Sequence, residues 1–566
     1  MAKGSDLDRV TAIVLREMRA PLIVLISAYS IGAGVMMLIP GIDGAPMSGF
    51  HAFYFMTYTA TTTGFGELPG EFSDAQRLWA TVCLYMSVIA WIYAIGTIIR
   101  LVQNPHFTLA IAQARFARSV KRIRQPFYII CGFGDTGSLL ARGLSDHHMT
   151  AVIVDVDVER IKALDMRDYN VPMPGLNGDA SVPKNLHDAG IGRAECKGVV
   201  LLTGDEDTNL KIAVMVRLLN PQAEIVYCTT THAHDEDLMG LGSVVLVDPF
   251  DVWARELGLA LQLPELHTLD EWLVGAHGVT LDRLISYPGG MWILCGYGRL
   301  GRCLYQALSA RGVHTVVIDP DIAAASEVTH KVAGSATRDN LLQAGVREAA
   351  GVVAATGSDP VNLAVLLTAR RVNPDTHLIV RQNHHENELA FSAASSDLIM
   401  QPSLVTARRM LLRLISPLIE ELLSYLEANP VFLRETLYPL LRERVSVTNP
   451  ALWAVCIDQV AAPAVMEVFA QQLALELGHL TRNPQDREEM LSCVALVVKR
   501  AGRLTTLPAE DFNLQAGDEI LFCGTQKAEA SLRATLKNCY NLEYLRTGIV
   551  PARSYAMSML TSTRGQ

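Results

Sequence analysis

The sequence lacks the marks of several large protein classes. Its ten cysteines include no Cys-x-x-Cys pair and follow no regular framework, which argues against a disulfide scaffold or a zinc ribbon and suits a reducing cytosol. The net charge is −10, so the chain lacks the basic surplus of a general nucleic-acid binder. No calcium-loop spacing occurs either. What is present is length and apolarity: 566 residues, which predict two to four domains, and a hydrophobic fraction of 50%.

Long uncharged apolar runs are few, and both lie near the N-terminus. They cover residues 21–39 and 79–99, and each approaches the roughly 20 residues that cross roughly 30 Å of hydrocarbon. A signal peptide is the alternative for the first run, but the run is long for one and no small-residue cleavage site follows. A buried core helix is the alternative for the second, and the basic residues after it favour a membrane span.

Basic residues flank these runs and avoid the segment between them. The segment 40–78 holds one, Arg77, whereas the flanks hold Lys3, Arg9, Arg16 and Arg19 before the first run and Arg100, Arg115, Arg118, Lys121, Arg122 and Arg124 after the second. The positive-inside rule therefore predicts a multi-pass protein of the cell (inner) membrane with both termini in the cytoplasm. Two spans leave no room for an Arg-rich voltage-sensing helix.

The segment between the runs is too apolar for an ordinary external loop. Residues 49–60 have the length of a short helix, and TTTGFGE follows at 61–67. Non-helical backbone at membrane depth is tolerated where it lines a water-filled cavity, and alternating glycines let successive carbonyls turn to one side. Rings of such carbonyls replace the hydration shell of a potassium ion. A Gly/Thr-rich external turn is the alternative.

Placed between two spans, this heptad resembles the filter of potassium channels, usually Thr-Val-Gly-Tyr-Gly-Asp. The resemblance implies that Thr62 supplies carbonyl and hydroxyl ligands to K⁺ at the inner end. Thr63, Gly64 and Phe65 would supply carbonyls, and Gly66 would close the outer mouth. Residues 20–103 would then be an outer helix, pore helix, filter and inner helix in a lipid bilayer, with four copies around one axis.

The heptad departs from the family pattern at three positions. Thr63 replaces Val, Phe65 replaces Tyr, and Glu67 replaces Asp. Phe65 lacks the phenolic donor that braces the filter from behind, which weakens the inference of selectivity. In the second run, Gly96 resembles the hinge glycine of inner helices. Close packing between membrane helices is the alternative for this glycine.

The rest of the chain contains one arrangement twice. An apolar strand, a Gly-x-Gly-x-x-Gly turn and a helix are followed, eighteen residues after the last glycine, by an acid. The residues are Gly132, Gly134, Gly137 and Asp155, then Gly296, Gly298, Gly301 and Asp319. One such motif is weak, but two with the acid at the expected spacing indicate dinucleotide-type turns. Alternating strands and helices predict two doubly wound parallel sheets, at roughly 126–250 and 290–402.

Tandem units of this kind behind a two-span pore resemble the RCK (regulator of K⁺ conductance) domains of two-transmembrane prokaryotic potassium channels. The resemblance covers nearly the whole chain. It implies α/β Rossmann-like domains and an α+β lobe after a helical pore. The parts are an N-terminus at 1–19, a pore at 20–103, a linker at 104–125, a first RCK domain at 126–289, a second Rossmann unit with crossover helices at 290–444, and a C-terminal lobe and tail at 445–566. We predict two helices in 403–440, broken at Asn429–Pro430.

The glycine turns are predicted to bind a nucleotide. Backbone N–H groups and the helix N-terminus would receive phosphate, while Asp155 and Asp319 would take ribose hydroxyls, which favours NAD or ADP over NADP. The second turn carries Arg299 where the first has Asp135, and Arg338 follows, so the second site is expected to favour anions. The alternative is that the turns keep the fold with empty pockets, and it weighs more for the first copy.

A divalent ion such as Ca²⁺ is a further possibility of the family. Asp205, Glu206 and Asp207 are the candidate ligands, and the alternative is that these acids cap a helix N-terminus. The sequence as a whole predicts a homotetrameric, ligand-gated potassium channel that is not an enzyme and has no nucleic-acid partner. A membrane-tethered NAD-dependent oxidoreductase is an alternative, but no Tyr-x-x-x-Lys pair accompanies either turn. A regulatory subunit of a potassium transporter is another, and the attached pore argues against it.

Overall fold

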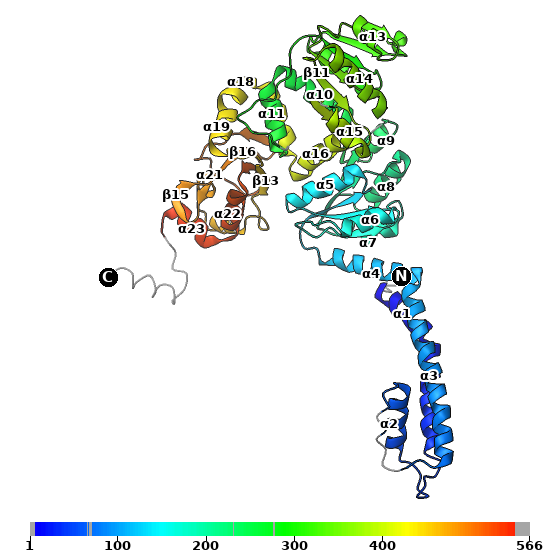
Figure 1. Cartoon of the computed structure of the whole chain (residues 1–566). Coiled ribbons are helices and arrows are strands. Elements are labelled where there is room, and N and C mark those ends of the chain that lie inside the picture. The colour runs from blue at the N-terminus through cyan, green and yellow to red at the C-terminus, as the bar shows by residue number, and fades with distance from the viewer. Residues whose placement is uncertain are drawn as a thin grey trace. The chain divides into compact units, whose positions relative to one another are not determined.

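The computed structural model describes residues 6–549 except 65, 67–70, 230, 276–277 and 395. The chain divides into two compact units (Figure 1). The N-terminal unit comprises residues 1–124 with 188–190, and the C-terminal unit comprises the remainder. All ten cysteines are free, as the irregular cysteine spacing predicts.

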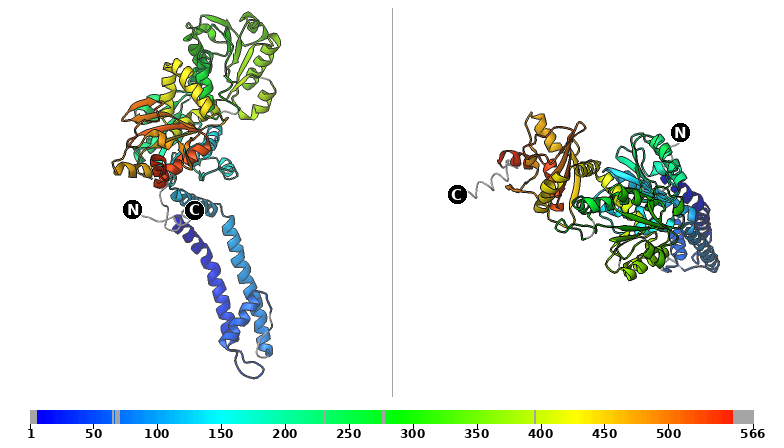
Figure 2. Two further views of the ribbon diagram at one scale, coloured as in Figure 1. Left: turned by 90° about the vertical axis from the view of Figure 1, so that its left-hand side faces the viewer. Right: turned by 90° about the horizontal axis from the view of Figure 1, so that it is seen from above.

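The N-terminal unit is a set of four helices. They are α1 (Asp6–Met36), α2 (Gly49–Ala60), α3 (Asp74–Gln103) and α4 (Pro105–Arg122). The long helices α1 and α3 lie side by side, with α2 packed against both (Figure 2). Two stretches are long and apolar enough to cross a membrane, Thr11–Met36 and Asp74–Gln103. Both predicted spans are therefore helical, although the first helix ends at Met36 and the predicted run continued to residue 39.

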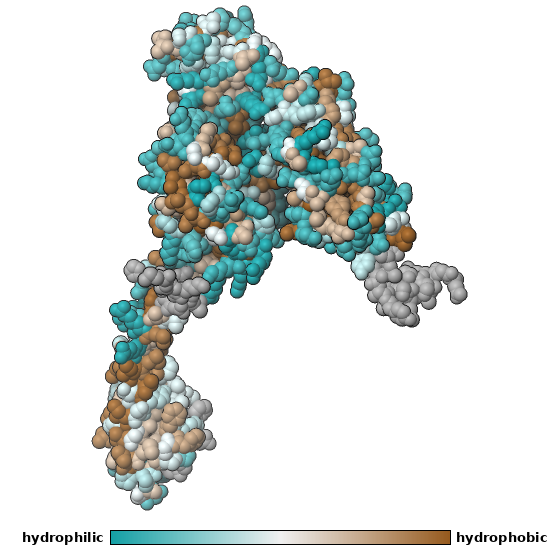
Figure 3. Space-filling model, turned by 180° about the vertical axis from the view of Figure 1, so that it is seen from behind, coloured by the Kyte–Doolittle hydropathy of each residue, from teal (hydrophilic) through white to brown (hydrophobic). Residues whose placement is uncertain are grey.

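Apolar side chains cover the outside of this unit (Figure 3). Ile23, Ile26, Ile89 and Ile92 are more than half exposed, which a lipid environment accommodates and water does not. Inside, α1, α2 and α3 meet at Gly32. A Cβ on Gly32 would lie 2.6 Å from the end of the Met56 side chain, so the helices approach closely there and a larger residue would displace that side chain.

The first Rossmann domain is a six-stranded parallel sheet in the order β3-β2-β1-β4-β5-β6. Its strands are β1 (Phe127–Cys131), β2 (Thr150–Asp155), β3 (Gly175–Asn177), β4 (Cys196–Leu201), β5 (Glu224–Cys228) and β6 (Val244–Val247). Its helices are α5 (Asp135–Asp146), α6 (Val158–Asp165), α7 (Pro183–Asp188), α8 (Glu206–Leu219) and α9 (Asp235–Met239). The order of strands turns back between β1 and β4, where open α/β sheets bind ligands.

The second Rossmann domain repeats that topology. Its parallel sheet has the order β12-β11-β10-β7-β8-β9, so β7 and β10 flank the corresponding switch point. The strands are β7 (Trp292–Cys295), β8 (Thr315–Asp319), β9 (His330–Ala333), β10 (Gly351–Ala354), β11 (His377–Arg381) and β12 (Leu398–Met400). The helices are α12 (Arg299–Ser309), α13 (Arg338–Gln343), α14 (Asp359–Val372) and α15 (Glu388–Ala393). The predicted doubly wound fold is confirmed for both domains.

Connecting helices follow each Rossmann domain. The first is followed by α10 (Pro249–Gln262) and α11 (Pro264–Leu273). The second is followed by α16 (Pro402–Ile415), α17 (Leu418–Ala428), α18 (Pro430–Phe432), a π-helical turn (Leu433–Leu437) and α19 (Tyr438–Arg444). The predicted break at Asn429–Pro430 is present, but residues 403–440 hold more than the two helices predicted. The chain also breaks between α16 and α17, because Pro417 has no N–H to continue the helix.

The C-terminal lobe is an antiparallel sheet in the order β13-β18-β16-β17, covered by helices. Its main strands are β13 (Ala451–Cys456), β16 (Cys493–Arg500), β17 (Arg503–Thr506) and β18 (Glu519–Gly524), with a small pair β14 (Arg482–Asn483) and β15 (Asp486–Met490). The helices are α20 (Pro463–Ala470), α21 (Leu477–Leu480), α22 (Gln526–Lys537) and α23 (Cys539–Thr547).

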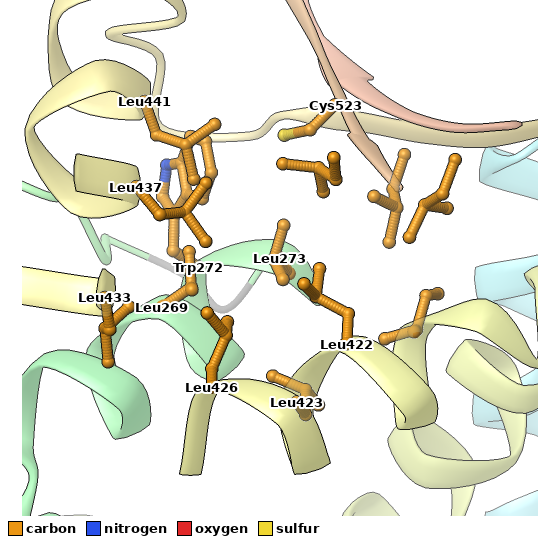
Figure 4. Close-up of a cluster of buried hydrophobic side chains, with 14 of the residues drawn as sticks. Leu269, Trp272, Leu273, Leu422, Leu423, Leu426, Leu433, Leu437, Leu441 and Cys523 are labelled. Atoms are coloured by element: carbon orange, nitrogen blue, oxygen red, sulfur yellow. The ribbon is translucent and has the colours of Figure 1, made fainter. Parts of the chain in front are cut away.

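One apolar core joins the connecting helices to the lobe (Figure 4). Trp272 of α11, Leu426 of α17 and Leu441 of α19 are fully buried there with Cys523 of β18. The Trp272 indole donates to the carbonyl of Val447 at 2.7 Å. Helix α11 follows the first Rossmann domain in sequence but packs with the helices that follow the second, a pairing that the sequence pattern leaves open.

Candidate functional site

The segment after α2 has the alternating backbone that its glycines predict. Gly64 and Gly66 have φ of 63° and 67°, and Thr62 has φ of 56°. A Cβ added to Gly64 would meet no atom within 4 Å, so the left-handed conformation, not space, calls for glycine there. Thr62 takes the same conformation at a cost of about 1–2 kcal/mol, a strain that the glycine pattern alone does not reveal.

The hydroxyl of Thr63 is bound to the end of α2. Thr63 Oγ1 lies 2.8 Å from Thr61 Oγ1, and Thr61 Oγ1 in turn donates to the carbonyl of Thr57 at 2.8 Å. The backbone N–H groups of Thr63 and Gly64 both point to the carbonyl of Tyr58. The departure from Val at Thr63 therefore adds a hydrogen bond behind the segment. The predicted roles of Phe65 and of Glu67 concern positions outside the described residues.

Gly96 lies inside α3, which runs through it without a break. A Cβ at Gly96 would meet nothing within 4 Å in this chain. Close packing within one chain therefore does not account for this glycine. A hinge role stays a prediction.

Each glycine of the nucleotide turns has a distinct physical role. Gly132 and Gly296 both have φ of 105°, which only glycine adopts without strain. A Cβ on Gly137 would lie 2.2 Å from the carbonyl oxygen of Gly132, and one on Gly301 would lie 2.0 Å from that of Gly296. The first and third glycines are thus required by the fold itself.

The middle glycine of each turn has free space around it, unlike the first and third glycines. Gly134 and Gly298 are the N-cap residues of α5 and α12, and neither helix start has a side-chain cap. A Cβ on Gly298 would meet nothing within 4 Å, and one on Gly134 only the Arg160 guanidinium, with Nη1 at 3.8 Å. Free space over an uncapped helix N-terminus suits the approach of a phosphate.

The two strand-end acids already hold their own glycine turns. Asp155 accepts hydrogen bonds from the N–H groups of Phe133 and Asp157. Asp319 accepts from Tyr297 N at 2.7 Å and Asp321 N at 2.8 Å. Each carboxylate oxygen has a second lone pair, so a ribose hydroxyl is compatible with this role. Both predicted acids lie at the turn, as the spacing requires.

The acid at the strand end is less exposed to solvent in the first nucleotide turn than in the second. The Asp155 side chain is 3% exposed and lies 3.5 Å from Arg160 Nη1, whereas Asp319 is only half-buried. Arg160 of α6 therefore places a positive charge at the first turn. The comparison of Asp135 with Arg299 in the sequence does not include this charge. Its position in α6, away from the glycine motif, explains why the motif does not show it.

Arg299 at the start of α12 is held by the end of the first Rossmann domain. Its Nη2 lies 3.5 Å from Asp248 Oδ2, and its guanidinium carbon lies 4.6 Å from the centre of the Phe250 ring. Arg381, at the end of β11, also lies 4.6 Å from that ring centre. Burial and the nearby Arg299 charge lower the pKa of Arg381. Two guanidinium groups thus share one aromatic ring, with Asp248 beside Arg299 and the charge of Asp359 acting on Arg381.

Arg338 is exposed on the first turn of α13. Its guanidinium makes no hydrogen bond or ion pair with the residues that the structure describes. Its predicted contribution to the second site stays a prediction.

The acidic side chains of residues 205–207 make contacts within the protein. Asp205 caps α8 by accepting from Thr208 N at 3.0 Å, and the hydrogen bonds from Thr208 lower the pKa of Asp205. Glu206 accepts from the N–H of Thr231 at 2.8 Å, and Asp207 lies 2.9 Å from the imidazole of His234. Within the described part of the chain, no cluster of His, Cys, Asp or Glu is arranged to hold a metal ion. The helix-capping alternative thus accounts for Asp205, and no observation supports Ca²⁺.

Comparison with protein families decides what these parts are. A model described as Ion channel matches residues 23–104, and a model described as TrkA-N domain matches residues 128–249 and 292–402. The chain therefore carries an ion-channel domain followed by two TrkA-N domains. The predicted architecture, a helical pore followed by tandem Rossmann-like RCK domains, is confirmed.

Relatives of this channel include proteins of archaea. Potassium channel protein 1 of Methanocaldococcus jannaschii is 27% identical over 245 residues, which are 43% of this chain and 70% of that protein. A protein of Methanothermus fervidus is 26% identical over 245 residues, 43% of this chain and 36% of that one. The matched region thus covers about a third of the Methanothermus fervidus protein and about two thirds of Potassium channel protein 1. Solved structures of the GsuK channel, one bound to NAD, are 17% identical over 94% of this chain and 100% of theirs, with TM-scores of 0.49 and 0.48.

Proposed function

We propose that this channel is a potassium-selective homotetramer of the cell membrane, gated by cytosolic NAD or ADP. The observation that carries the pore assignment is the segment after α2, where Thr62, Gly64 and Gly66 take positive φ in alternation between two apolar helices. One chain supplies one such segment, so a closed ring of carbonyls requires several copies. The basic flanks of the spans support cytoplasmic termini.

The second glycine turn supports an anionic ligand. The N–H groups of an uncapped helix start lie beside Gly298, where nothing fills the space of a side chain. Arg299 and Arg381 bring two guanidinium groups to this part of the domain, next to the carboxylates of Asp248 and Asp359. Asp319, at the end of β8, suits ribose hydroxyls and would repel a 2′-phosphate, which favours NAD or ADP over NADP.

Ligand control of the pore has a simple energetic limit. A nucleotide shifts the pore equilibrium only by the difference between its affinities for the open and closed states. The basic helix α4 joins α3 to the first Rossmann domain in the chain, so it is the segment through which a change in the TrkA-N domains would reach the inner helix.

Ion flux through liposomes tests the proposal. Full-length protein in vesicles should pass K⁺ far better than Na⁺, and Gly64→Ala should abolish that preference because alanine is strained at φ 63°. Gly34→Ala is the matched control, since a Cβ at Gly34 meets nothing within 4 Å and this glycine is not left-handed. Equal fluxes of the two ions through wild type would contradict the filter assignment.

A further inference from the structure

A cavity in the C-terminal unit lies apart from both sites described above. Its volume is about 190 Å³, and its walls come from the end of β6 and from α10, α11, α16 and α17. The polar and charged residues that line it are Asp251, Arg255, Glu256, His267, Asp270, Arg409, Glu420 and Ser424. We name it the joint cavity, because it lies where the helices after the first Rossmann domain meet those after the second.

Two carboxyl groups in the joint cavity have no partner among the described residues. Asp270 Oδ1 is buried without a hydrogen bond, and the side chain of Glu256 makes no hydrogen bond or ion pair with the described part of the chain. Buried acids are normally hydrogen-bonded or paired. A negative charge on the buried, unbonded Oδ1 of Asp270 is therefore costly unless a nearby cation, a proton or water compensates it.

The nearby cations are already engaged. Arg408 makes a forked contact with Glu271, at 2.9 and 3.2 Å. On the other walls, Arg409 lies 3.4 Å from Glu420 and Arg255 lies 2.5 Å from Glu427.

The pKa of Glu256 is raised by this environment. Burial, then the negative charges of Asp270 and Glu271, raise the pKa of Glu256 to about 8, against the opposing pull of Arg409 and Arg408. Burial also raises the pKa of Asp270, against Arg409. His267 faces the same space, and burial lowers its pKa, so it stays uncharged at neutral pH.

We propose that the joint cavity is a proton-sensing site in which Glu256 holds a proton at neutral pH and releases it under alkaline conditions. Release places a second negative charge beside Asp270, and like charges in a poorly hydrated space repel. Glu256 lies on α10 and Asp270 on α11, so the repulsion acts between these two helices, while Arg409 of α16 attracts the charged Glu256.

The walls of the joint cavity lead to both glycine turns. Helix α10 begins at Asp248, the residue that holds Arg299. Helix α16 packs on α5, where the Leu411 side chain would lie 2.6 Å from a Cβ on Gly143, and α5 begins at the first turn. A change in the packing of α10 and α16 therefore reaches both turns through single helices.

Infrared spectroscopy of the full-length protein in detergent, with a chelator present, tests the proton directly. Wild type should show the carbonyl stretch of a protonated carboxylic acid at pH 7 that is lost by about pH 9, near and above the pKa of about 8. Glu256→Gln should lack this band. The exposed Glu443 of α19 supplies the matched control, and Glu443→Gln should leave the band unchanged.

A second variant covers the case in which Glu256→Gln does not fold. Asp270→Asn removes the like charge that raises the pKa of Glu256 most, so the band should disappear at lower pH than in wild type. A wild type without the band, a band that persists in Glu256→Gln, or an unchanged midpoint in Asp270→Asn would each overturn the proposal.

Unfolding gives an independent readout with a defined sign. Because the folded-state pKa of Glu256 is raised, its contribution to stability is present below the unfolded pKa and is lost as the pH rises toward 8. One proton changes the ratio of folded to unfolded protein about tenfold per pH unit. Wild type should therefore lose thermal stability between about pH 4.5 and 8 relative to Glu256→Gln. Parallel curves for the two proteins would contradict the assignment.

Discussion

The glycines of the second nucleotide turn offer the sharpest test of whether that turn binds a ligand or only keeps the fold. Gly298 and Gly301 lie three residues apart at the start of α12. A Cβ at Gly298 meets nothing within 4 Å, while a Cβ at Gly301 meets the carbonyl oxygen of Gly296 at 2.0 Å. The same change, glycine to alanine, therefore perturbs a ligand at one position and the protein at the other.

The two substitutions are expected to change different quantities: Gly298→Ala the affinity for the ligand, and Gly301→Ala the stability of the domain. Gly298 has φ of −69°, which alanine adopts freely, so Gly298→Ala should cost no more than about 1 kcal/mol of stability for the poorer N-cap. Its methyl group would occupy the approach to the N–H groups of α12. Loss of one charge-assisted hydrogen bond costs about 1.5–3 kcal/mol, or roughly tenfold to a hundredfold in affinity. Gly301→Ala should destabilise the domain by about 1–3 kcal/mol or more through backbone displacement.

The assay pairs calorimetric titration of ADP and NAD with thermal unfolding of the same full-length preparations. Gly298→Ala should lose affinity with an almost unchanged melting temperature, and Gly301→Ala should lose both. Gly289→Ala is the matched control, because a Cβ there also meets nothing within 4 Å and the residue precedes β7. If Gly298→Ala binds nucleotide as wild type does, phosphate does not approach this helix start, and the turn serves the fold alone.

Two further predictions concern single contacts. Asp248→Asn removes the carboxylate 3.5 Å from Arg299 and should raise the affinity of the second site for ADP several-fold by calorimetry; an unchanged or lower affinity would show that Asp248 does not compete with phosphate. Thr63→Val removes a hydroxyl that is bonded to Thr61 behind the filter segment, so the K⁺/Na⁺ flux ratio in liposomes should be kept; a loss of selectivity would show that the hydroxyl faces the ions.

Much of the fold was predictable because its signals are local. Two uncharged runs, alternating strands and helices, and glycines at fixed spacing each reflect a constraint that acts within about twenty residues. The helix at Gly49–Ala60, the positive φ of Gly64 and Gly66, and the place of Asp319 beside its turn all follow from such constraints. The break at Pro417 was missed although proline marks it, because the apolar pattern continues across it.

The sequence by itself determined the order of the parts and the glycines that the turns require, since backbone geometry depends on nearby residues, whereas the two switch points follow from the strand order of the folded sheets. Only the tertiary structure decided what the charged side chains meet. Arg299 lies against Asp248 and Phe250 from the preceding domain, Arg160 lies beside Asp155, and Glu256 and Asp270 line one cavity. These partners come from different helices and strands, and electrostatic energy depends on distance and burial in space, which spacing along the chain does not encode.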